Sequence, residues 1–198
     1  KGSLRRRSPD LVLEELHIAK EKGYRGISFF DDVFTVNKRW LADFLPRYKD
    51  EIGLPFWCYT YPTTHDPDIL KMLVDAGCNS ITMGIQSGSE RILTGLYDRN
   101  TKINRVLQAA HEIVDAGFAK CSFDMIPRTD VDCEEDLKKT LDLLLARPLE
   151  MQVVTFGRLT AFPNFALNER YKDPEILAAS EHIPEALYMY YFKLFYLS

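Results

Sequence analysis

The chain has 198 residues, of which 46% are hydrophobic and 27% are charged, a composition typical of a globular protein of one domain. Its formal net charge of −4 argues against nucleic acid as the main partner, and its length is short for a closed eight-stranded α/β barrel of about 250 residues. It contains no run of about 18 apolar residues, so we expect no membrane partner and a cytoplasmic location.

Five helix-then-strand units are predicted in chain order, as in a parallel sheet with crossover helices. The first helix begins at Ser8-Pro9, because serine accepts from first-turn amides and proline needs no donor there. Pro46 is expected to kink or restart the second helix. The helices should end at Gly23, Gly53, Gly77, Gly117 and Pro148, and the strands should cover residues 26–30, 55–60, 80–86, 120–126 and 151–156. Residues 186–197, rich in Tyr, Phe and Leu, are expected to form a docking helix or part of a further segment.

Polar side chains lie at the carboxyl ends of the predicted strands, where parallel α/β folds bind ligands. The candidates are Asp31, Asp32, Tyr59, Thr60, His65, Gln86, Ser87, Asp124, Arg158 and Thr160. Asp31 or Asp32 could instead cap a turn, and residues 86–90 also fit a turn followed by a capped helix start. We expect His65 to lie at the surface before a helix. A carboxylate such as Asp124 within an apolar strand must be paired or hydrogen-bonded.

The cysteines have no C-x-x-C spacing, so the sequence indicates neither a zinc ribbon nor an iron–sulfur motif. They are Cys58, Cys78, Cys121 and Cys133, and we expect reduced, mostly buried thiols. There is no Gly-x-Ser-x-Gly elbow, phosphate-binding glycine loop or His-Glu-x-x-His helix, which leaves nucleophilic and nucleotide hydrolysis without support. We assign no metal ligand within the chain.

Three ordered segments resemble the radical S-adenosylmethionine superfamily, most closely the group whose members often carry a cobalamin-binding domain ahead of the radical domain. The similarity covers roughly residues 5–170. The segments are Arg5-Arg6-Arg7-Ser8-Pro9, Gly26-Ile27-Ser28-Phe29-Phe30-Asp31-Asp32-Val33-Phe34 and Gly84-Ile85-Gln86-Ser87-Gly88-Ser89-Glu90-Arg91-Ile92-Leu93.

The resemblance implies an α/β fold: a partial (β/α)6, TIM-like barrel with its first strand missing, in which outer helices cover a parallel sheet. It places this domain at residues 1–170, followed at 171–198 by a helical appendage or the start of a further segment. Members of the family bind a [4Fe-4S] cluster and S-adenosylmethionine and cleave the latter reductively to a 5′-deoxyadenosyl radical. Cobalamin is a candidate further cofactor.

The resemblance also implies roles for individual residues. Phe30, Asp31 and Asp32 match the strand end that holds the amino group of S-adenosylmethionine, and Gln86 and Ser87 match positions that meet its ribose. The other members of the predicted cofactor-binding set are Tyr59 and Asp124 at strand ends, Ile126 with Pro127 beside the adenine, Thr160-Ala161-Phe162-Pro163 near the base, and Arg99 near the place of an arginine that meets the carboxylate.

The sequence departs from the family pattern in several places. Arg99 lies one residue later than the family's arginine, and Asp98 stands at the expected spacing. The C-x-x-x-C-x-x-C loop that ligates the cluster should precede Arg5 and is absent, so we expect cluster ligands upstream and no activity from this chain alone. Pro127-Arg128-Thr129-Asp130 replaces a glycine-rich turn, and Pro163-Asn164-Phe165 replaces a common Pro-Gly-Thr.

The expected partners are a small-molecule or peptide substrate and a reductant such as flavodoxin or ferredoxin, with no nucleic acid and no membrane. Two alternatives stay open beside the radical enzyme. One is a degenerate barrel that serves as a binding or scaffold domain. The other is a metal-dependent hydrolase or lyase that uses Asp31, Asp32, His65 and Asp124 as ligands.

Overall fold

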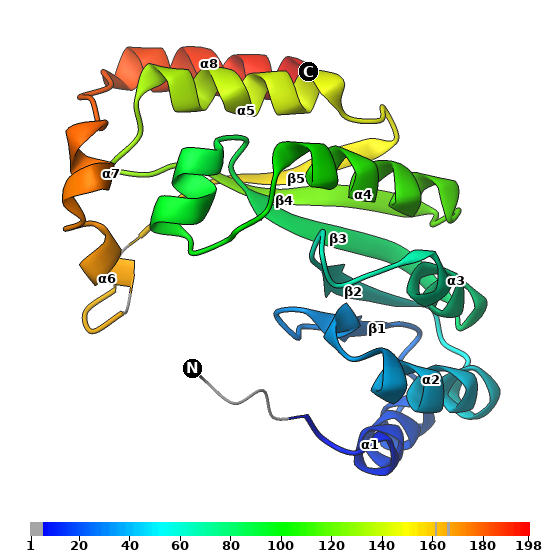
Figure 1. The fold of residues 1–198 in the computed structure, drawn as a ribbon. Coiled ribbons are helices and arrows are strands. Elements are labelled where there is room, and N and C mark those ends of the chain that lie inside the picture. Colours follow the sequence, from blue (N-terminus) through cyan, green and yellow to red (C-terminus); the bar gives the residue numbers. More distant parts are fainter. Residues whose placement is uncertain (1–5, 161, 166) are drawn as a thin grey trace.

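A parallel sheet of five strands in the order β1-β2-β3-β4-β5 forms the centre of the molecule (Figure 1). The structure is a computed structural model and describes residues 6–160, 162–165 and 167–198. Arg5 and Ala161, which the resemblance includes, lie outside the described residues. The predicted α/β fold, with a parallel sheet and outer helices, is confirmed.

Each strand follows a helix, as the sequence predicts. The helices are α1 (Pro9–Glu21), α2 (Lys38–Arg47), α3 (Pro67–Asp75), α4 (Ile103–Asp115) and α5 (Glu134–Ala146). The strands are β1 (Ile27–Phe29), β2 (Phe56–Thr60), β3 (Cys78–Gln86), β4 (Lys120–Arg128) and β5 (Met151–Arg158). The remaining elements are the turns η1 (Phe34–Val36), η2 (Tyr48–Ile52) and η3 (Ile92–Leu96) and the helices α6 (Leu167–Arg170), α7 (Pro174–Ala178) and α8 (Glu185–Leu197). None of the helices in the described part of the chain is long and apolar enough to cross a membrane.

Local sequence signals explain where the helices begin and end. The side chain of Ser8 accepts from the Leu11 amide at the start of α1, as expected. The four predicted glycine stops, Gly23, Gly53, Gly77 and Gly117, all have positive φ. Pro46 lies inside α2, and the helix continues into the π-helical turn η2. The predicted irregularity at this proline therefore takes the form of a change in helix type.

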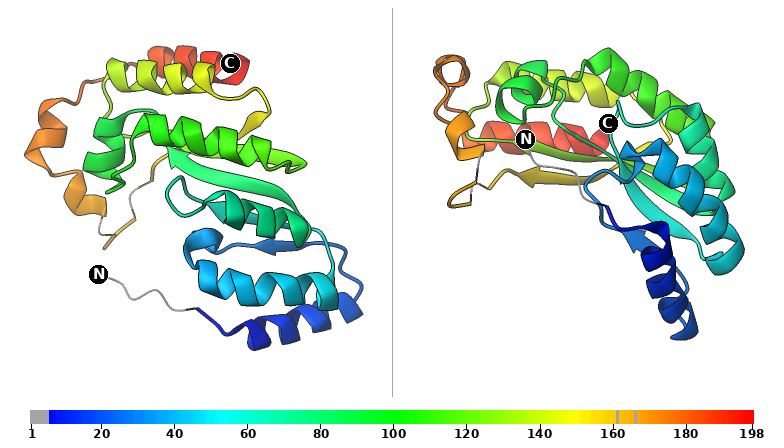
Figure 2. Two further views of the ribbon diagram at one scale, coloured as in Figure 1. Left: turned by 45° about the vertical axis from the view of Figure 1, so that its right-hand side comes forward. Right: turned by 60° about the horizontal axis from the view of Figure 1, so that its bottom comes forward.

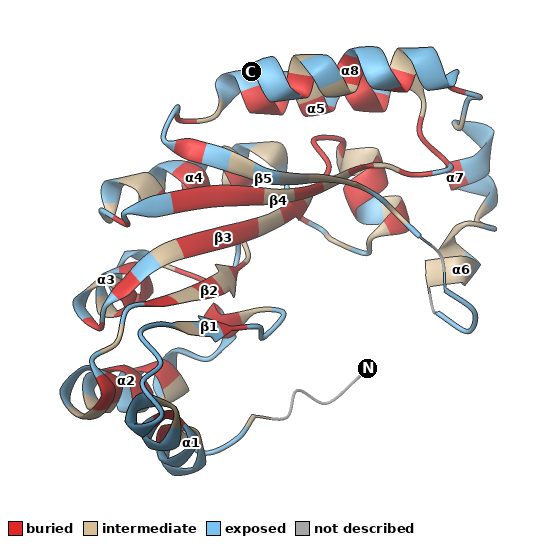
Figure 3. Cartoon of the chain, turned by 180° about the vertical axis from the view of Figure 1, so that it is seen from behind, coloured by how far each residue is buried: buried red, intermediate tan, exposed pale blue. Residues whose placement is uncertain are grey.

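Alternate residues of the strands face opposite sides of the sheet. Cys58, Ile81 and Phe123 are fully buried in the core under the helices, which lie together on one side of the curved sheet (Figures 1 and 2). Buried residues are concentrated in β3 and β4, in the middle of the sheet (Figure 3). On the opposite face, Trp57 Nε1 donates to Thr82 Oγ1 at 2.8 Å. This face is therefore polar and aromatic where the helix side is apolar.

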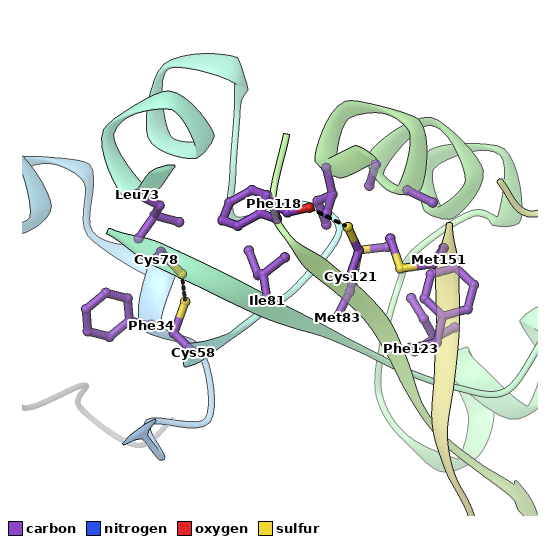
Figure 4. Packing of buried hydrophobic residues seen from close by; sticks show 14 of the residues in the cluster. Phe34, Cys58, Leu73, Cys78, Ile81, Met83, Phe118, Cys121, Phe123 and Met151 are labelled. Atoms are coloured by element: carbon purple, nitrogen blue, oxygen red, sulfur yellow. Dashed lines mark hydrogen bonds between the residues drawn. The ribbon is translucent and has the colours of Figure 1, made fainter. Parts of the chain in front are cut away.

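The cysteines belong to the core or its edge. Cys58, Cys78 and Cys121 are buried and Cys133 is half-buried, and all four are free, as expected. The sulfur atoms of Cys58 and Cys78 lie 3.8 Å apart on neighbouring strands (Figure 4). Burial raises the pKa of Cys58 and of Cys121, so these thiols stay protonated.

Helix α8 docks on the domain beside α5 (Figure 1). The hydroxyl of Tyr188 donates to the Thr129 carbonyl at 3.0 Å and to Asp132 Oδ2 at 2.9 Å. The ring of Phe156 packs against Phe195 with centroids 5.4 Å apart. Of the two expectations for this segment, a docking helix is the one observed. The domain boundary at residue 170 stays a prediction.

We predict that Gly88→Ala lowers the free energy of unfolding by about 2 kcal/mol. An added Cβ would lie 2.5 Å from the Lys139 carbonyl oxygen and 2.5 Å from Thr140 Cα, both backbone atoms of α5. Urea denaturation measures the loss. The control is Gly157→Ala, whose Cβ would meet no atom closer than 3.9 Å. Equal stability of the two variants would contradict the close approach of this turn to α5.

Candidate functional site

A cavity of about 380 Å³ opens at the carboxyl ends of β1 to β4. It combines side chains from the three strands β2, β3 and β4, from the loop after β1 and from the segment after η3. Six of the ten predicted cofactor-binding residues line it: Phe30, Asp32, Tyr59, Gln86, Arg99 and Asp124. The structure therefore gathers at one place residues that are up to 94 positions apart between Phe30 and Asp124.

Strand register brings the polar side chains of this cavity together. Tyr59 pairs with Thr82, and Gly84 pairs with Asp124, so β2, β3 and β4 end side by side. Because Gly84 has no side chain, space is left between its neighbours at this level. Burial and the nearby Asp124 carboxylate together raise the pKa of Tyr59. The phenol thus remains protonated beside a carboxylate.

The loop after β1 carries the two adjacent carboxylates. Phe29 before it and Phe34 after it stack in the core, with ring centroids 4.6 Å apart. Between them Phe30 is 77% exposed and lies edge-on to Trp57. Strand β1 is one residue shorter at each end than predicted, so Phe30 belongs to the loop.

The two carboxylates of this loop diverge. Asp32 lines the cavity, whereas Asp31 lines a neighbouring hollow with Arg6. Both are exposed. The helical turn η1 has Val33 at its N-cap and no side-chain cap, so neither carboxylate caps this turn. The adjacent acids are therefore available to different neighbours.

Gln86 has two features that are costly without a ligand. Its φ is +73°, in the left-handed region that few residues other than glycine adopt. Its Oε1 atom is buried and has no hydrogen-bond partner among the described residues. Backbone strain and an unsatisfied polar atom each cost about 1–3 kcal/mol and are concentrated at binding sites. Gln86 is therefore the clearest sign in the cavity of a missing polar partner.

Arg99 supplies a cation to the cavity. Its Nη1 donates to the Gly84 carbonyl at 3.0 Å, and its guanidinium lies 5.0 Å from the centroid of the Tyr61 ring. Sequence reasoning missed Tyr61, although the alternation along β2 places it on the same face as Tyr59. The guanidinium is thus held in place by a carbonyl and an aromatic ring.

Besides Asp31, three of the predicted cofactor-binding residues do not line the cavity. Ser87 Oγ accepts from the Ser89 amide at 3.1 Å within the turn that follows Gln86. Ile126 is half-buried and its carbonyl accepts from the Tyr97 hydroxyl at 3.1 Å, while Thr160 is exposed beyond the end of β5. The predicted contacts of these three residues with a cofactor stay predictions.

The alternative interpretation of residues 86–90 describes the segment after Gln86. Ser89 Oγ donates to Asp136 Oδ1 at 2.6 Å, and Glu90 Oε1 accepts from the Ile103 amide at 3.0 Å. Arg91 forms an ion pair with the same Asp136. The turn therefore holds β3 against α5 and α4, while Gln86 faces the cavity.

The expectation of a surface position for His65 is wrong, because its side chain is completely buried. Its Nδ1 lies 3.0 Å from Thr60 Oγ1, and its Nε2 lies 3.6 Å from Glu112 Oε2. Burial lowers the pKa of His65 to about 4, an effect to which the Arg105 charge adds. The imidazole is therefore neutral at pH 7.

The metal-site alternative finds no cluster of ligands. In residues 6–160, 162–165 and 167–198, no group of three or more His, Cys, Asp or Glu side chains is arranged to hold a metal ion. Of the four suggested ligands, Asp32 and Asp124 share the cavity, Asp31 lines the neighbouring hollow and His65 bonds within a buried network. The geometry gives this alternative no support.

Comparison with known proteins identifies what the chain is similar to. A family model described as the Radical SAM superfamily matches residues 1–144. A tRNA-2-methylthio-N(6)-dimethylallyladenosine synthase from Azobacteroides pseudotrichonymphae is 30% identical over 159 residues, which make up 73% of this chain and 34% of that protein. An uncharacterized methyltransferase of Pyrococcus horikoshii is 35% identical over 88 residues, 43% of this chain and 19% of that one. The chain thus spans about a third or less of these relatives.

A solved structure shows the same fold. Coproporphyrinogen III oxidase (HemN) from Escherichia coli, described as a radical SAM enzyme, superimposes with a TM-score of 0.71 at 17% identity. The match covers 96% of this chain and 45% of that one. The partial-barrel architecture expected from the sequence is confirmed by this likeness.

We predict that His65 makes the free energy of unfolding fall as the pH drops from about 6.5 to about 4. The folded protein keeps the imidazole neutral, since its pKa is about 4, whereas the unfolded chain takes up a proton below about pH 6.5. Acid therefore favours the unfolded chain in this window, by about 3 kcal/mol in full. Denaturant unfolding of the wild type and His65→Asn at several pH values measures the difference in slope.

The matched control is His111→Asn, a change at an exposed histidine of α4. This variant should keep the wild-type dependence of stability on pH. If the wild type and His65→Asn lose stability in parallel over the window, the imidazole of His65 is not held neutral.

Proposed function

This chain belongs to the radical SAM superfamily, and from that premise we propose that it is the core of an enzyme that binds S-adenosylmethionine for reductive cleavage to a 5′-deoxyadenosyl radical. The binding site is the cavity at the carboxyl ends of β1 to β4. The observation that carries this proposal is the match between the charges of the cavity and those of the cofactor.

S-adenosylmethionine carries two positive groups, the ammonium and the sulfonium, and one carboxylate. The cavity presents the complementary set, with two carboxylates from Asp32 and Asp124 and one guanidinium from Arg99. Charge-assisted hydrogen bonds and bidentate arginine–carboxylate pairs are the strongest polar contacts available to such a ligand. We assign the ammonium to the Phe30–Asp32 loop and the carboxylate to Arg99.

The neutral part of the cofactor finds suitable partners as well. The unsatisfied Oε1 of Gln86 is an acceptor for a ribose hydroxyl, which would remove the cost of leaving this atom buried and unpaired. Phe30 and Tyr59 add aromatic surface to the same cavity. Contacts of Ser87, Ile126 and Thr160 with the cofactor stay predictions, because none of the three lines the cavity.

The iron–sulfur cluster does not fit the cysteines of this chain. Cys58, Cys78 and Cys121 are buried, and Cys133 is separate from them at the start of α5. A [4Fe-4S] cluster supplies the electron that cleaves S-adenosylmethionine in this family. We therefore assign to this chain the binding of the cofactor and derive no step through the cluster. A flavodoxin or ferredoxin reductant, a small-molecule or peptide substrate and the use of cobalamin stay predictions.

We predict that the double variant Asp32→Asn, Asp124→Asn binds S-adenosylmethionine at least about tenfold more weakly, because two favourable charge contacts are lost. Equilibrium dialysis under anaerobic conditions measures the dissociation constant. Asp115→Asn with Asp142→Asn is the control, since both acids are exposed on outer helices. Unchanged binding in the first pair would refute the proposed site, and a wild type without affinity would favour the scaffold alternative.

We predict that the 198-residue chain, supplied with iron, sulfide and dithionite, forms no 5′-deoxyadenosine from S-adenosylmethionine. Its described cysteines are too far buried or too isolated to ligate three irons of one cluster. Liquid chromatography of the reaction mixture detects the product, with a complete radical SAM enzyme assayed in parallel. Product formation by this chain would show that other side chains ligate a cluster.

A further inference from the structure

A chain of buried polar side chains connects helix α4 with the loop that carries the two carboxylates. Glu112 on α4 faces His65 Nε2 at 3.6 Å, and His65 Nδ1 lies 3.0 Å from the hydroxyl of Thr60. The Thr60 hydroxyl is 2.8 Å from that of Thr35, which is 2.7 Å from the hydroxyl of Thr64. His65, Thr60 and Thr35 are each at most 6% exposed. The hydrogen-bonded part of this path runs from His65 through Thr60 and Thr35 to Thr64. The 3.6 Å between Glu112 and His65 Nε2 is longer than a hydrogen bond, and neither atom has a hydrogen-bond partner among the described residues.

Thr35 is the point at which this path reaches the loop. It lies in η1, directly after Phe34, whose ring is fixed in the core against Phe29. Just before Thr35 in the chain, Arg6 donates to the carbonyls of Val33 and Phe34 at 3.2–3.3 Å. The carboxylates of residues 31 and 32 are therefore carried by a short segment whose far end is held by the Thr35 hydroxyl.

The protonation of the His65 ring sets the direction of the hydrogen bonds along the path. Each hydroxyl has a single proton to donate, so the proton on the imidazole decides in which direction the whole series of hydrogen bonds runs. With the proton on Nδ1, donation passes from His65 to Thr60, Thr35 and Thr64 and ends at the Tyr61 carbonyl, which accepts at 3.0 Å. Removing the ring takes away one of the two hydrogen-bond partners of the buried Thr60 hydroxyl and leaves it bonded to Thr35 alone.

We propose that His65 is a positioning residue: through Thr60 and Thr35 it fixes the loop of Asp31 and Asp32 and thereby the recognition of the amino-acid part of S-adenosylmethionine. The fixing of the loop is a property of the ligand-free chain, whereas the effect on S-adenosylmethionine recognition rests on the proposed function. His65 itself does not line the cavity; Thr60 does.

Comparing the affinities of each variant for two ligands distinguishes a positioning role of His65 from a general loss of stability. S-adenosylmethionine contains the amino acid, whereas 5′-methylthioadenosine keeps the adenosine and lacks it. We expect His65→Leu and the milder Thr35→Val each to weaken binding of S-adenosylmethionine about tenfold. Binding of 5′-methylthioadenosine should weaken less than about twofold. The double variant should be no weaker than either single one, because both changes break one path. His65→Asn, which keeps a polar group near Nδ1, should restore most of the affinity.

The control is Tyr48→Phe, which removes another hydrogen bond, from the Tyr48 hydroxyl to the Leu54 carbonyl, between two residues that do not line the cavity. Tyr48→Phe should lower the affinity for both ligands by the same factor, or for neither. Equal weakening of both ligands by His65→Leu and Thr35→Val, or the same selective loss in Tyr48→Phe, would overturn the proposal.

Hydrogen exchange of the ligand-free protein tests whether His65 positions the loop, independently of any ligand. Amides of residues 30–36 should exchange about tenfold faster in His65→Leu and Thr35→Val, with β3 and β4 unchanged. Unchanged exchange in this loop refutes the positioning role whatever the ligands do. A wild type that binds neither ligand refutes the proposed function, and exchange then decides the role of His65 by itself.

Discussion

The parallel register of four neighbouring strands is the constraint on which the candidate site depends. It brings the ends of β1 to β4 to one edge, where Tyr59 and Asp124 project from the face that the helices leave open. The same alternation sends Cys58 and Phe123 into the core. A slip of one residue in any strand would exchange the two sets, burying the carboxylate and exposing the apolar side chains. Burial of the core therefore fixes the geometry of the cavity.

Local signals in the sequence were sufficient for the order of the elements, since glycine stops and apolar periodicity act within a few residues. They were also sufficient to place Tyr59 and Gln86 at strand ends and Asp124 within the fourth strand. They could not separate Gln86 from Ser87, because the turn between them is imposed by the packing of Gly88 on α5, whose Thr140 is 52 positions away. Nor could they bury His65, whose side-chain partners Thr60 and Glu112 come from two different elements, β2 and α4. Such contacts are long-range and leave no local pattern.

The molecule separates two kinds of polar chemistry. On the helix side, buried groups such as Asp136 and Ser89 satisfy one another and join secondary structure elements. In the cavity, by contrast, the side-chain oxygen of Gln86 is unpaired and its backbone is strained. The guanidinium of Arg99 contacts the Gly84 carbonyl and the Tyr61 ring, and it has further N–H groups that can bind a ligand. The unpaired oxygen of Gln86 therefore lies where a zwitterionic ligand would complete it.

The strictly sequential order of the sheet has a consequence for how the chain acquires its structure. Every strand pairs only with the strand before it and the one after it. During synthesis each new helix–strand unit can thus add to an edge that is already present, without waiting for a distant segment, as in stacked repeat proteins. Helix α8 is the exception, since Tyr188 must return to Thr129 and Asp132 near the end of β4. It closes the assembly from the last part of the chain, after all five strands have been laid down.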